Sequence, residues 1–211
     1  MDEDLEWALS SSIDGQVKGS SNSIVTIQDE CIAFPLDPDV SEELYFANVG
    51  TNDDTTTLTF SSNITKIDTI DDQLVVATED GHVYMLDKIN MSSCGYDATQ
   101  LDSAKGFSTD DGRYDAVEKL QDGSYAISAS YGGSRRILMY ESGPQFPFTK
   151  PNYSIDTLLN SLVTGIDEFA APGSEYLNLV VYGERGTVGV FYPEAHPAHN
   201  GRYGSPVRRI E

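Results

Sequence analysis

The stretch Gln-Leu-Val-Val-Ala-Thr-Glu-Asp-Gly-His-Val-Tyr-Met-Leu-Asp, from Gln73 to Asp87, predicts two short strands joined by a tight turn. Its first part, Leu74 to Ala77, is apolar throughout and contains two valines, as in a strand buried on both faces. Asp80-Gly81 is a hairpin signal, because Gly81 can adopt the positive φ of a two-residue primed turn. The β-branched and aromatic residues from His82 to Leu86 predict a second strand. A hairpin of this size is not stable alone in water, so the fold depends on whether the chain repeats it.

The chain does repeat this pattern. Strand, glycine turn and strand follow one another again in Tyr125 to Glu141 and in Leu177 to Tyr192, and a fainter copy spans Ile24 to Phe34. The turn glycines lie 52 and 53 residues apart, at Gly81, Gly133 and Gly186. A further candidate strand precedes each clear copy, at Ile64–Ile70, Ala116–Leu120 and Val163–Phe169. A period near fifty residues with at least three strands per unit indicates a β-propeller.

The segment from Ala77 to Asp87 resembles the end of a WD40 repeat, in which a small residue and Asp-Gly precede a strand that ends in Trp-Asp. Ser128 to Glu141 and Val180 to Tyr192 are looser versions, and the resemblance covers about residues 22 to 193. The strands here end in Leu-Asp, Tyr-Glu and Phe-Tyr, and the Gly-His pair that opens many repeats of the family is absent from the start of each repeat. The family's His/Asp hydrogen-bond network is therefore not assumed. The resemblance implies four-stranded antiparallel blades and a role in protein recognition.

At about fifty residues per blade, the 211 residues predict about four blades, at 23–62, 63–101, 114–145 and 163–193. The resemblance implies six to eight blades for a complete ring. We therefore expect a small closed ring, an open propeller completed by a partner or by a second copy, or a part of a larger propeller. Outside the blades we expect an acidic arm at 1–22 and a flexible basic tail at 194–211. Ile155 to Leu162 predicts one short helix.

The formal net charge of −21, from 34 acidic and 13 basic residues, disfavours nucleic acid and anionic membranes as partners. The acidic residues are concentrated at the start, since residues 1 to 60 hold 13 of them and a single Lys. This pattern predicts either a solvated surface or an acidic face that binds a basic protein.

The sequence features that report on the compartment favour an intracellular protein, cytoplasmic or nuclear. No apolar run is long enough to span a bilayer, and the N-terminal segment lacks the apolar core of a secretory signal. The two cysteines, Cys31 and Cys94, do not form a disulfide framework and are expected to be reduced thiols. Asn-x-Ser/Thr triplets begin at Asn63, Asn90 and Asn152, and chance explains them.

The search for catalytic residues gives no clear candidate, so an enzyme is not the favoured class and no cofactor or metal is expected. His196 and His199 lie among Pro and Gly residues that give a metal site no rigid support. The acidic pairs, such as Glu79-Asp80 and Asp110-Asp111, are explained by Asp side chains bonding to the backbone of turns. A propeller-type hydrolase remains the alternative, with a metal or carboxylate site in a central channel. Bound calcium, or a channel-facing cluster among Asp29, Asp80 and Glu184, would favour it.

Aromatic and basic residues around the exit of the third repeat are the best candidates for binding a protein. They are Tyr131, Arg135, Arg136, Phe146 and Phe148. Tyr and Arg are the residue types that anchor protein interfaces. The two phenylalanines equally suit a second role, as plugs between blades. The first hypothesis is therefore a non-enzymatic interaction scaffold, and a truncated propeller without independent function is the third.

Overall fold

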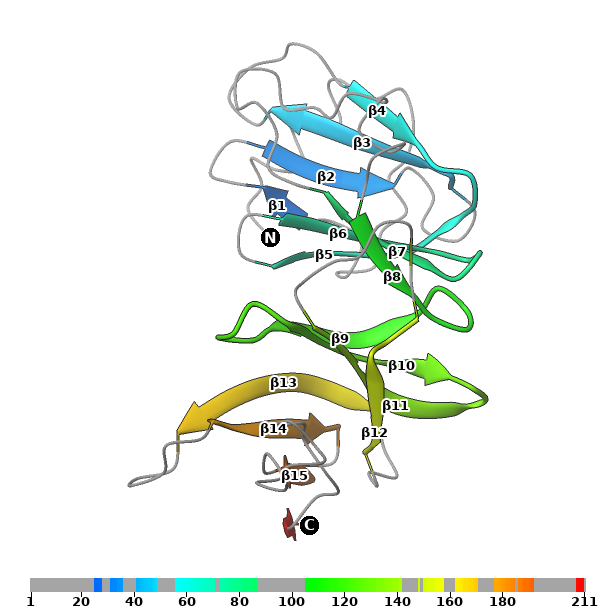
Figure 1. The fold of residues 1–211 in the computed structure, drawn as a ribbon. Helices are drawn as coiled ribbons and strands as arrows, with labels where there is room; N and C mark the ends of the chain where they lie inside the picture. Colours follow the sequence, from blue (N-terminus) through cyan, green and yellow to red (C-terminus); the bar gives the residue numbers. More distant parts are fainter. Residues whose placement is uncertain are drawn as a thin grey trace. The chain divides into compact units, whose positions relative to one another are not determined.

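The computed structural model describes residues 25–27, 31–35, 41–48, 56–70, 73–86, 105–141, 148, 150–157, 162–170, 177–184, 186–191 and 208–210. This part of the chain is all-β, with strands in four antiparallel four-stranded sheets and no helix among the described residues (Figure 1). In each sheet the spatial order of the strands is their order in the sequence, so each sheet is a simple meander. Four such meanders at a period near fifty residues are the propeller-like repeats that the sequence predicts.

The strand bounds are as follows. The first sheet contains β1 (Val25–Ile27), β2 (Cys31–Pro35), β3 (Glu43–Asn48) and β4 (Thr56–Thr59). The second contains β5 (Ile64–Ile70), β6 (Gln73–Thr78), β7 (His82–Leu86) and β8 (Lys105–Ser108). The third contains β9 (Tyr114–Lys119), β10 (Tyr125–Tyr131), β11 (Ser134–Tyr140) and β12 (Tyr153–Asp156). The fourth contains β13 (Val163–Ala170), β14 (Leu177–Gly183), β15 (Val188–Phe191) and β16 (Arg208–Ile210).

The chain divides into two compact units, each with its own core. Unit 1 is Met1–Arg113 together with Phe146–Phe148, and unit 2 is Tyr114–Gln145 together with Thr149–Glu211. In unit 1, alternate residues of the first two sheets share one apolar cluster, including Ala33, Leu44, Phe46, Leu58, Ile67, Leu74, Val76 and Leu86. In unit 2, the third and fourth sheets do the same through residues that include Ala126, Ile137, Met139, Ile155, Ile166, Leu179, Val181 and Phe191. Period-two alternation thus brings one face of each sheet against its neighbour within the unit.

The first strands of the second, third and fourth sheets each carry a β-bulge at their second residue. The register against the following strand shifts at Thr65, at Asp115 and at Thr164. The three bulges lie about one repeat apart and place Ala129 and Gly183 at positions equivalent to Thr78. Such a bulge increases local twist and redirects the side chain of the extra residue. The bulges are therefore a structural mark of the repeat.

The turn between β6 and β7 differs from the predicted two-residue primed turn. Gly81 has the expected positive φ, 92°, but its N–H donates to Thr78 O at 3.1 Å, so the central residues are Glu79 and Asp80. Gly81 follows the turn, as in three-residue loops with a left-handed glycine. The primed geometry occurs instead between β10 and β11, where Gly132 and Gly133 have φ values of 61° and 78°.

The outer strands account for the other differences from the expected boundaries. The second sheet extends to Ser108, and the third to Asp156. Ile155 belongs to β12 and pairs with Ile137, so the helix predicted from that residue is wrong over its first two positions; residues 158–161 lie outside the described part. Arg208–Ile210, expected in a flexible tail, pairs with the edge of β15, where unpaired backbone groups are available. The arm at 1–22 and residues 194–207 lie outside the described part of the chain.

Candidate functional site

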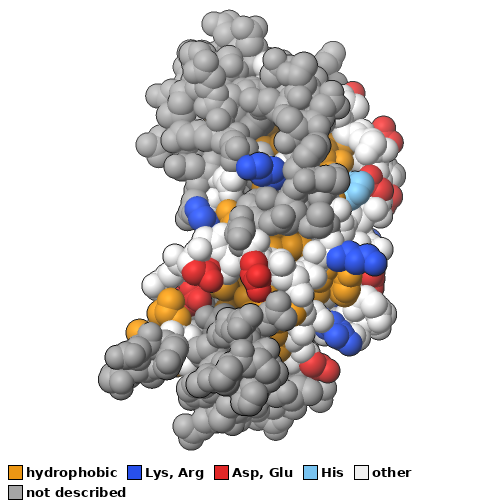
Figure 2. All heavy atoms as spheres, in the orientation of Figure 1, with side chains coloured by type: hydrophobic (Ala, Val, Ile, Leu, Met, Phe, Trp, Pro, Cys, Tyr) orange, Lys and Arg blue, Asp and Glu red, His pale blue; other side chains and the backbone are white. Residues whose placement is uncertain are grey.

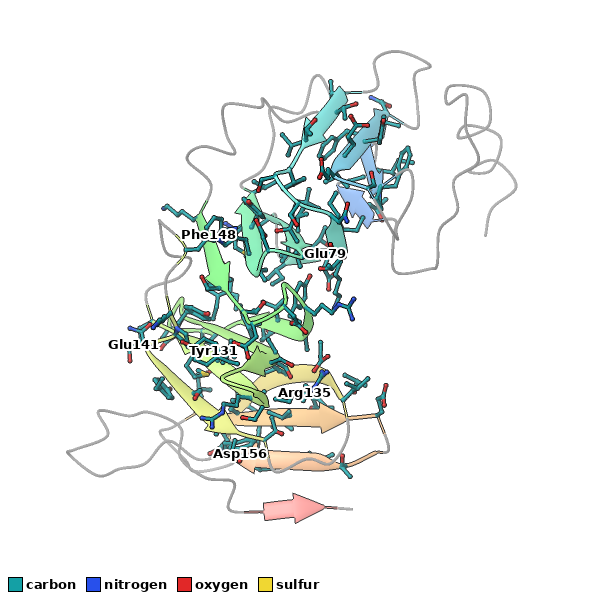
Figure 3. The ribbon with its side chains drawn as sticks, turned by 90° about the vertical axis from the view of Figure 1, so that its right-hand side faces the viewer. Glu79, Tyr131, Arg135, Glu141, Phe148 and Asp156 are labelled. Atoms are coloured by element: carbon teal, nitrogen blue, oxygen red, sulfur yellow. The ribbon has the colours of Figure 1, made fainter. Side chains whose placement is uncertain are left out.

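The tip of the β10–β11 hairpin presents three of the five residues predicted to bind a partner. Tyr131 pairs with Ser134 across the two-glycine turn, and Arg135 and Arg136 follow on β11. Tyr131 and Arg136 are half-buried, whereas the glycines, Ser134 and Arg135 are exposed. A two-residue turn between paired strands holds such side chains on a short, ordered hairpin (Figure 3). The hairpin tip, residues 131–136, is a compact polar and aromatic surface.

The two arginines of the hairpin tip have different partners. Arg135 forms an ion pair with Asp115, the bulge residue of β9. Asp115 also accepts a hydrogen bond from Ser128 Oγ at 3.2 Å. The bulge thus directs a carboxylate of the first strand toward a cation of the third. The charge of Arg135 is neutralised within unit 2.

Arg136 points along the sheet toward β12. Its Nε donates to Ser134 Oγ at 2.9 Å and its NH1 donates to Ser154 Oγ at 3.0 Å. These two bonds fix the guanidinium plane while using neutral acceptors. Asp156 on β12 pairs with Arg136 on β11. Arg136 is therefore a positioned cation at the hairpin tip.

Phe148 packs against the second sheet, and its role as a plug between blades stays a prediction. Its ring stacks on His82, with centroids 4.3 Å apart, and meets Tyr84 edge-on at 4.8 Å. The ring also covers Gly106, where an added Cβ would lie 2.3 Å from Phe148 Cε1. Phe148 is half-buried and packs on the core of unit 1, whereas Tyr131 and the arginines belong to unit 2. Phe146, the fifth candidate, lies outside the described residues.

The sequence did not reveal a hydrogen-bond network that surrounds Asp80 at the β6–β7 turn. Asp80 Oδ1 accepts a bond from Thr78 Oγ1 at 2.7 Å, and Oδ2 accepts one from Ser61 Oγ at 3.3 Å. His82 Nδ1 lies 3.2 Å from Asp80 Oδ2. Beside it, Asn63 Nδ2 donates to Glu79 Oε2 at 3.1 Å. The network connects the loop before β5 to the turn after β6.

The network lowers the pKa of Asp80 below its usual value. Partial burial, the largest single influence, acts to raise this pKa, but the Thr78 hydrogen bond, the charge of His82, the His82 N–H and the Ser61 hydroxyl together outweigh it. The pKa of the nearby Tyr84 hydroxyl is raised, first by burial and then by the Asp80 charge, against hydrogen bonds with Ser61 and Thr78. Asp80 is held in its charged, acceptor form.

The hydrogen bonds around Asp80 hold the β6–β7 turn in place and do not form a catalytic triad. A hydrolytic triad needs a hydroxyl bonded to the imidazole that removes its proton, but Ser61 and Thr78 both donate to the carboxylate. Among the described residues no group of three or more His, Cys, Asp or Glu side chains is placed to hold a metal ion. Of the three acids whose clustering would favour the hydrolase hypothesis, Asp29 is outside the described part, and Asp80 and Glu184 belong to different units.

Cys31 corrects the expectation of reduced thiols, because it is disulfide-bonded. It lies on β2 and contributes to the core of unit 1. The one other cysteine in the sequence, Cys94, lies outside the described residues. Two cysteines far apart in a sequence show no framework pattern, so the disulfide could not be predicted from their spacing.

Acidic and basic side chains are interspersed on the described surface. In Figure 2, acidic side chains are spread over the visible face with basic ones between them. The search for membrane spans found no helix of sufficient length and apolarity in the described part of the chain.

Comparisons with known proteins give likenesses of structure alone. No family model and no curated protein matches the sequence. The computationally designed Ika4 protein is 15% identical, with a TM-score of 0.44 over 84% of this chain and 95% of its own. BBS1N, solved in complex with ARL6DN, is 13% identical, with a TM-score of 0.47 over 94% of this chain and 56% of its own. Raptor from Chaetomium thermophilum is 15% identical, with a TM-score of 0.49 over 100% of this chain and 20% of its own.

This chain thus spans about half of the BBS1N chain and a fifth of Raptor. At these identities and TM-scores, the similarities provide no argument about function. The four repeated four-stranded sheets are therefore shown by the strand pairing within this chain.

Proposed function

We propose that this chain is a non-enzymatic interaction module of WD40-like type, which binds a protein partner. The observation that carries the proposal is the hairpin tip at residues 131–136, where Tyr131 and the positioned Arg136 stand on a two-glycine turn. Tyr and Arg contribute strongly to binding because they combine apolar area with directed hydrogen bonds. The ordered β-sheet beneath them reduces the entropy that binding would cost.

The chemistry of the hairpin tip favours a partner that offers carboxylates. The ion pair with Asp115 neutralises Arg135, whereas Arg136 bonds to the hydroxyls of Ser134 and Ser154. A partner carboxylate can therefore bond to the Arg136 guanidinium, and Tyr131 adds an amphipathic ring beside it. A short acidic segment is the ligand that this surface fits best.

Site-specific photo-cross-linking tests the proposal. A cross-linking amino acid at position 131 is compared with one at Thr57, which is exposed on β4 of the other unit. The expected result is a discrete cross-linked protein from position 131 alone. The purified partner should then bind Tyr131→Ala and Arg136→Ala about tenfold or more weakly than the wild type.

Lys150→Ala removes an exposed cation from the same unit and serves as the matched control. Wild-type affinity is expected for this variant. Equal cross-linking from both positions, or equal weakening by Lys150→Ala, would show that the contact is non-specific and would overturn the proposal.

A further inference from the structure

The imidazole of His82, the first residue of β7, has one nitrogen that solvent does not reach. Nδ1 is buried, and among the described residues the polar atom that lies near it is Asp80 Oδ2, 3.2 Å away. The side chain as a whole is 37% exposed, so the rest of the ring can exchange protons with water. A carboxylate oxygen beside Nδ1 favours the tautomer with a proton on that nitrogen. Nε2 is therefore the nitrogen that takes up the second proton when the ring becomes charged.

The face of the same ring is covered by Phe148. The two rings are stacked, with centroids 4.3 Å apart and planes at 21°, and Tyr84 lies edge-on to both, at 6.0 Å from His82 and 4.8 Å from Phe148 (Figure 3). The segment 146–148 belongs to unit 1, whereas the chain on either side of it belongs to unit 2. The segment itself contains no ionisable residue, and Lys150, which follows it, is part of unit 2. Ring contacts therefore attach this segment to unit 1.

Strands β7 and β8 place no charge on the side of the sheet that carries His82. On β8, Ser108 pairs with His82, whereas Lys105 pairs with Met85 and so belongs to the opposite face. On β7, Tyr84 shares the face of His82, and burial raises the pKa of its hydroxyl, which is therefore neutral between about pH 5 and 8. The ring of His82 thus has uncharged neighbours on both strands.

The charge that faces His82 comes from the turn before it. Asp80 is held in its charged form by the Thr78 hydroxyl, which donates to Oδ1 at 2.7 Å. The neighbouring carboxylate, Glu79, accepts a hydrogen bond from Asn63 at 3.1 Å. The charge of His82 is one of the causes that lower the pKa of Asp80, and by reciprocity the Asp80 carboxylate favours the charged imidazole.

A second proton on His82 strengthens the contacts of the ring on two sides. Toward Asp80, the contact between Nδ1 and the carboxylate becomes an ion pair with a charge-assisted hydrogen bond. Toward Phe148, a positive charge lies over the ring, well within the distance of about 6 Å at which the negative face of an aromatic ring attracts a cation. The neutral imidazole retains only the stacking.

We infer that His82 is a pH-dependent switch, which attaches the segment 146–148 more firmly to unit 1 when the imidazole is charged. Histidine ordinarily changes its charge between about pH 5 and 8. The added contribution is fully present on the acid side of this range and is lost as the ring gives up its proton with rising pH. The switch acts within the connection between β11 and β12, and it does not depend on the proposed function.

A double-mutant cycle on the full chain tests the inference, with denaturant unfolding at about pH 5.5 and about pH 8. His82→Gln keeps a polar side chain without a titratable ring, and Phe148→Leu keeps apolar bulk without an aromatic face. The coupling between the two positions, expressed as a factor in the unfolding equilibrium constant, should be about threefold or more larger at the lower pH. Asp80→Asn should reduce this difference, because the charged ring then loses its partner. His196 and His199 are present in every variant, so their titration cancels.

Phe60→Leu combined with His82→Gln is the matched control. Phe60 contacts Tyr84, at 5.1 Å and edge-on, so its coupling to His82 should be the same at both pH values. If Phe148→Leu unfolds unit 1, Phe148→Met replaces it in the cycle. A coupling between positions 82 and 148 that is equal at the two pH values, or larger at about pH 8, overturns the inference. These variants leave the hairpin tip unchanged, so either result is independent of the cross-linking test of the proposed function.

Discussion

Phe148 stacks on His82, with ring centroids 4.3 Å apart and the ring planes at 21°. The two residues are far apart in sequence, and Phe148 is the only described residue of the segment 146–148 that joins unit 1. Its ring also contacts Tyr84, which in turn contacts Phe60 at 5.1 Å. A chain of aromatic rings thus attaches this short segment to the core formed by the first and second sheets.

Replacing Phe148 with alanine should destabilise unit 1. A fully buried Phe→Ala change costs about 3–5 kcal/mol, and because Phe148 is half-buried we expect about 2 kcal/mol in the free energy of unfolding. Phe169→Ala is the matched control, because that ring is exposed on the fourth sheet, and it should cost less than about 0.5 kcal/mol. Denaturant titrations compare the two variants. Equal losses would mean that Phe148 is not part of the core.

Gly112 should tolerate alanine much less well than Gly123 does. Both have positive φ, 61° and 83°, but a Cβ at Gly112 would lie 1.5 Å from Thr78 O, whereas nothing lies within 4 Å of one at Gly123. Gly123→Ala should therefore cost only the backbone strain, about 1–2 kcal/mol. Gly112→Ala adds a clash with backbone, and we expect a loss of about 3 kcal/mol or more. Thermal unfolding of both variants gives the comparison, and a smaller loss at Gly112 would contradict the contact.

The sequence predicts the inner parts of the sheets well, because these strands bury alternate or continuous apolar residues. The bounds expected for β5 and β7 agree with the structure, and Leu74 to Ala77 are buried on both faces of β6 as predicted. These strands have a clear pattern because neighbouring strands cover them on both sides and apolar side chains fill the space between the sheets.

The outermost strands of the second and third sheets could not be found in this way. Strands β8 and β12 each bury only one large side chain, Phe107 and Ile155 respectively. A four-residue segment with one buried residue has no detectable period, so backbone pairing with an existing sheet edge decides its structure. The spacing of Leu158, Leu159 and Leu162 places them on one face of a helix and so predicts one, but Leu162 is exposed in the structure.

The candidate site was predictable in part. Composition pointed to Tyr131, Arg135 and Arg136, but not to the ion pair between Arg135 and Asp115, which depends on the β9 bulge. The Asp80 network was missed because Ser61 lies 19 residues from Asp80 and becomes its neighbour only through the β5–β6 pairing. Hydrogen bonds between distant polar residues leave no local pattern in a sequence.

The pKa of Asp80 predicts a pH dependence of stability. Its folded value lies below the ordinary 3.8, so the network stabilises the native state fully above the unfolded pKa and loses this contribution as pH falls through the folded value. Asp80→Asn should therefore be less stable than the wild type at neutral pH, and the difference should shrink as pH falls below about 4. Chemical denaturation across this range measures it. Glu184→Gln removes one exposed carboxylate from unit 2 and is the control for the loss of a negative charge.

The disulfide at Cys31 should stabilise unit 1, which contains that residue in its core. Removing a disulfide typically costs about 2–4 kcal/mol, because the unfolded chain regains freedom that the link had restricted. We expect Cys31→Ser to lower the free energy of unfolding by about this amount, and a thiol reductant to lower that of the wild type equally. The reductant should have no effect on the Cys31→Ser variant, because no disulfide remains to be broken.

Counting the free thiols shows whether Cys31→Ser destabilises unit 1 by removing the disulfide or by removing a buried side chain. Cys31 is 8% exposed, so Cys31→Ser also places a hydroxyl in the core, whereas Cys31→Ala removes the link without adding a polar group. Both variants should release one reactive thiol, at Cys94, that the untreated wild type lacks. If the unfolded wild type shows two free thiols before reduction and is insensitive to the reductant, Cys31 is a buried thiol and unit 1 is held by packing alone.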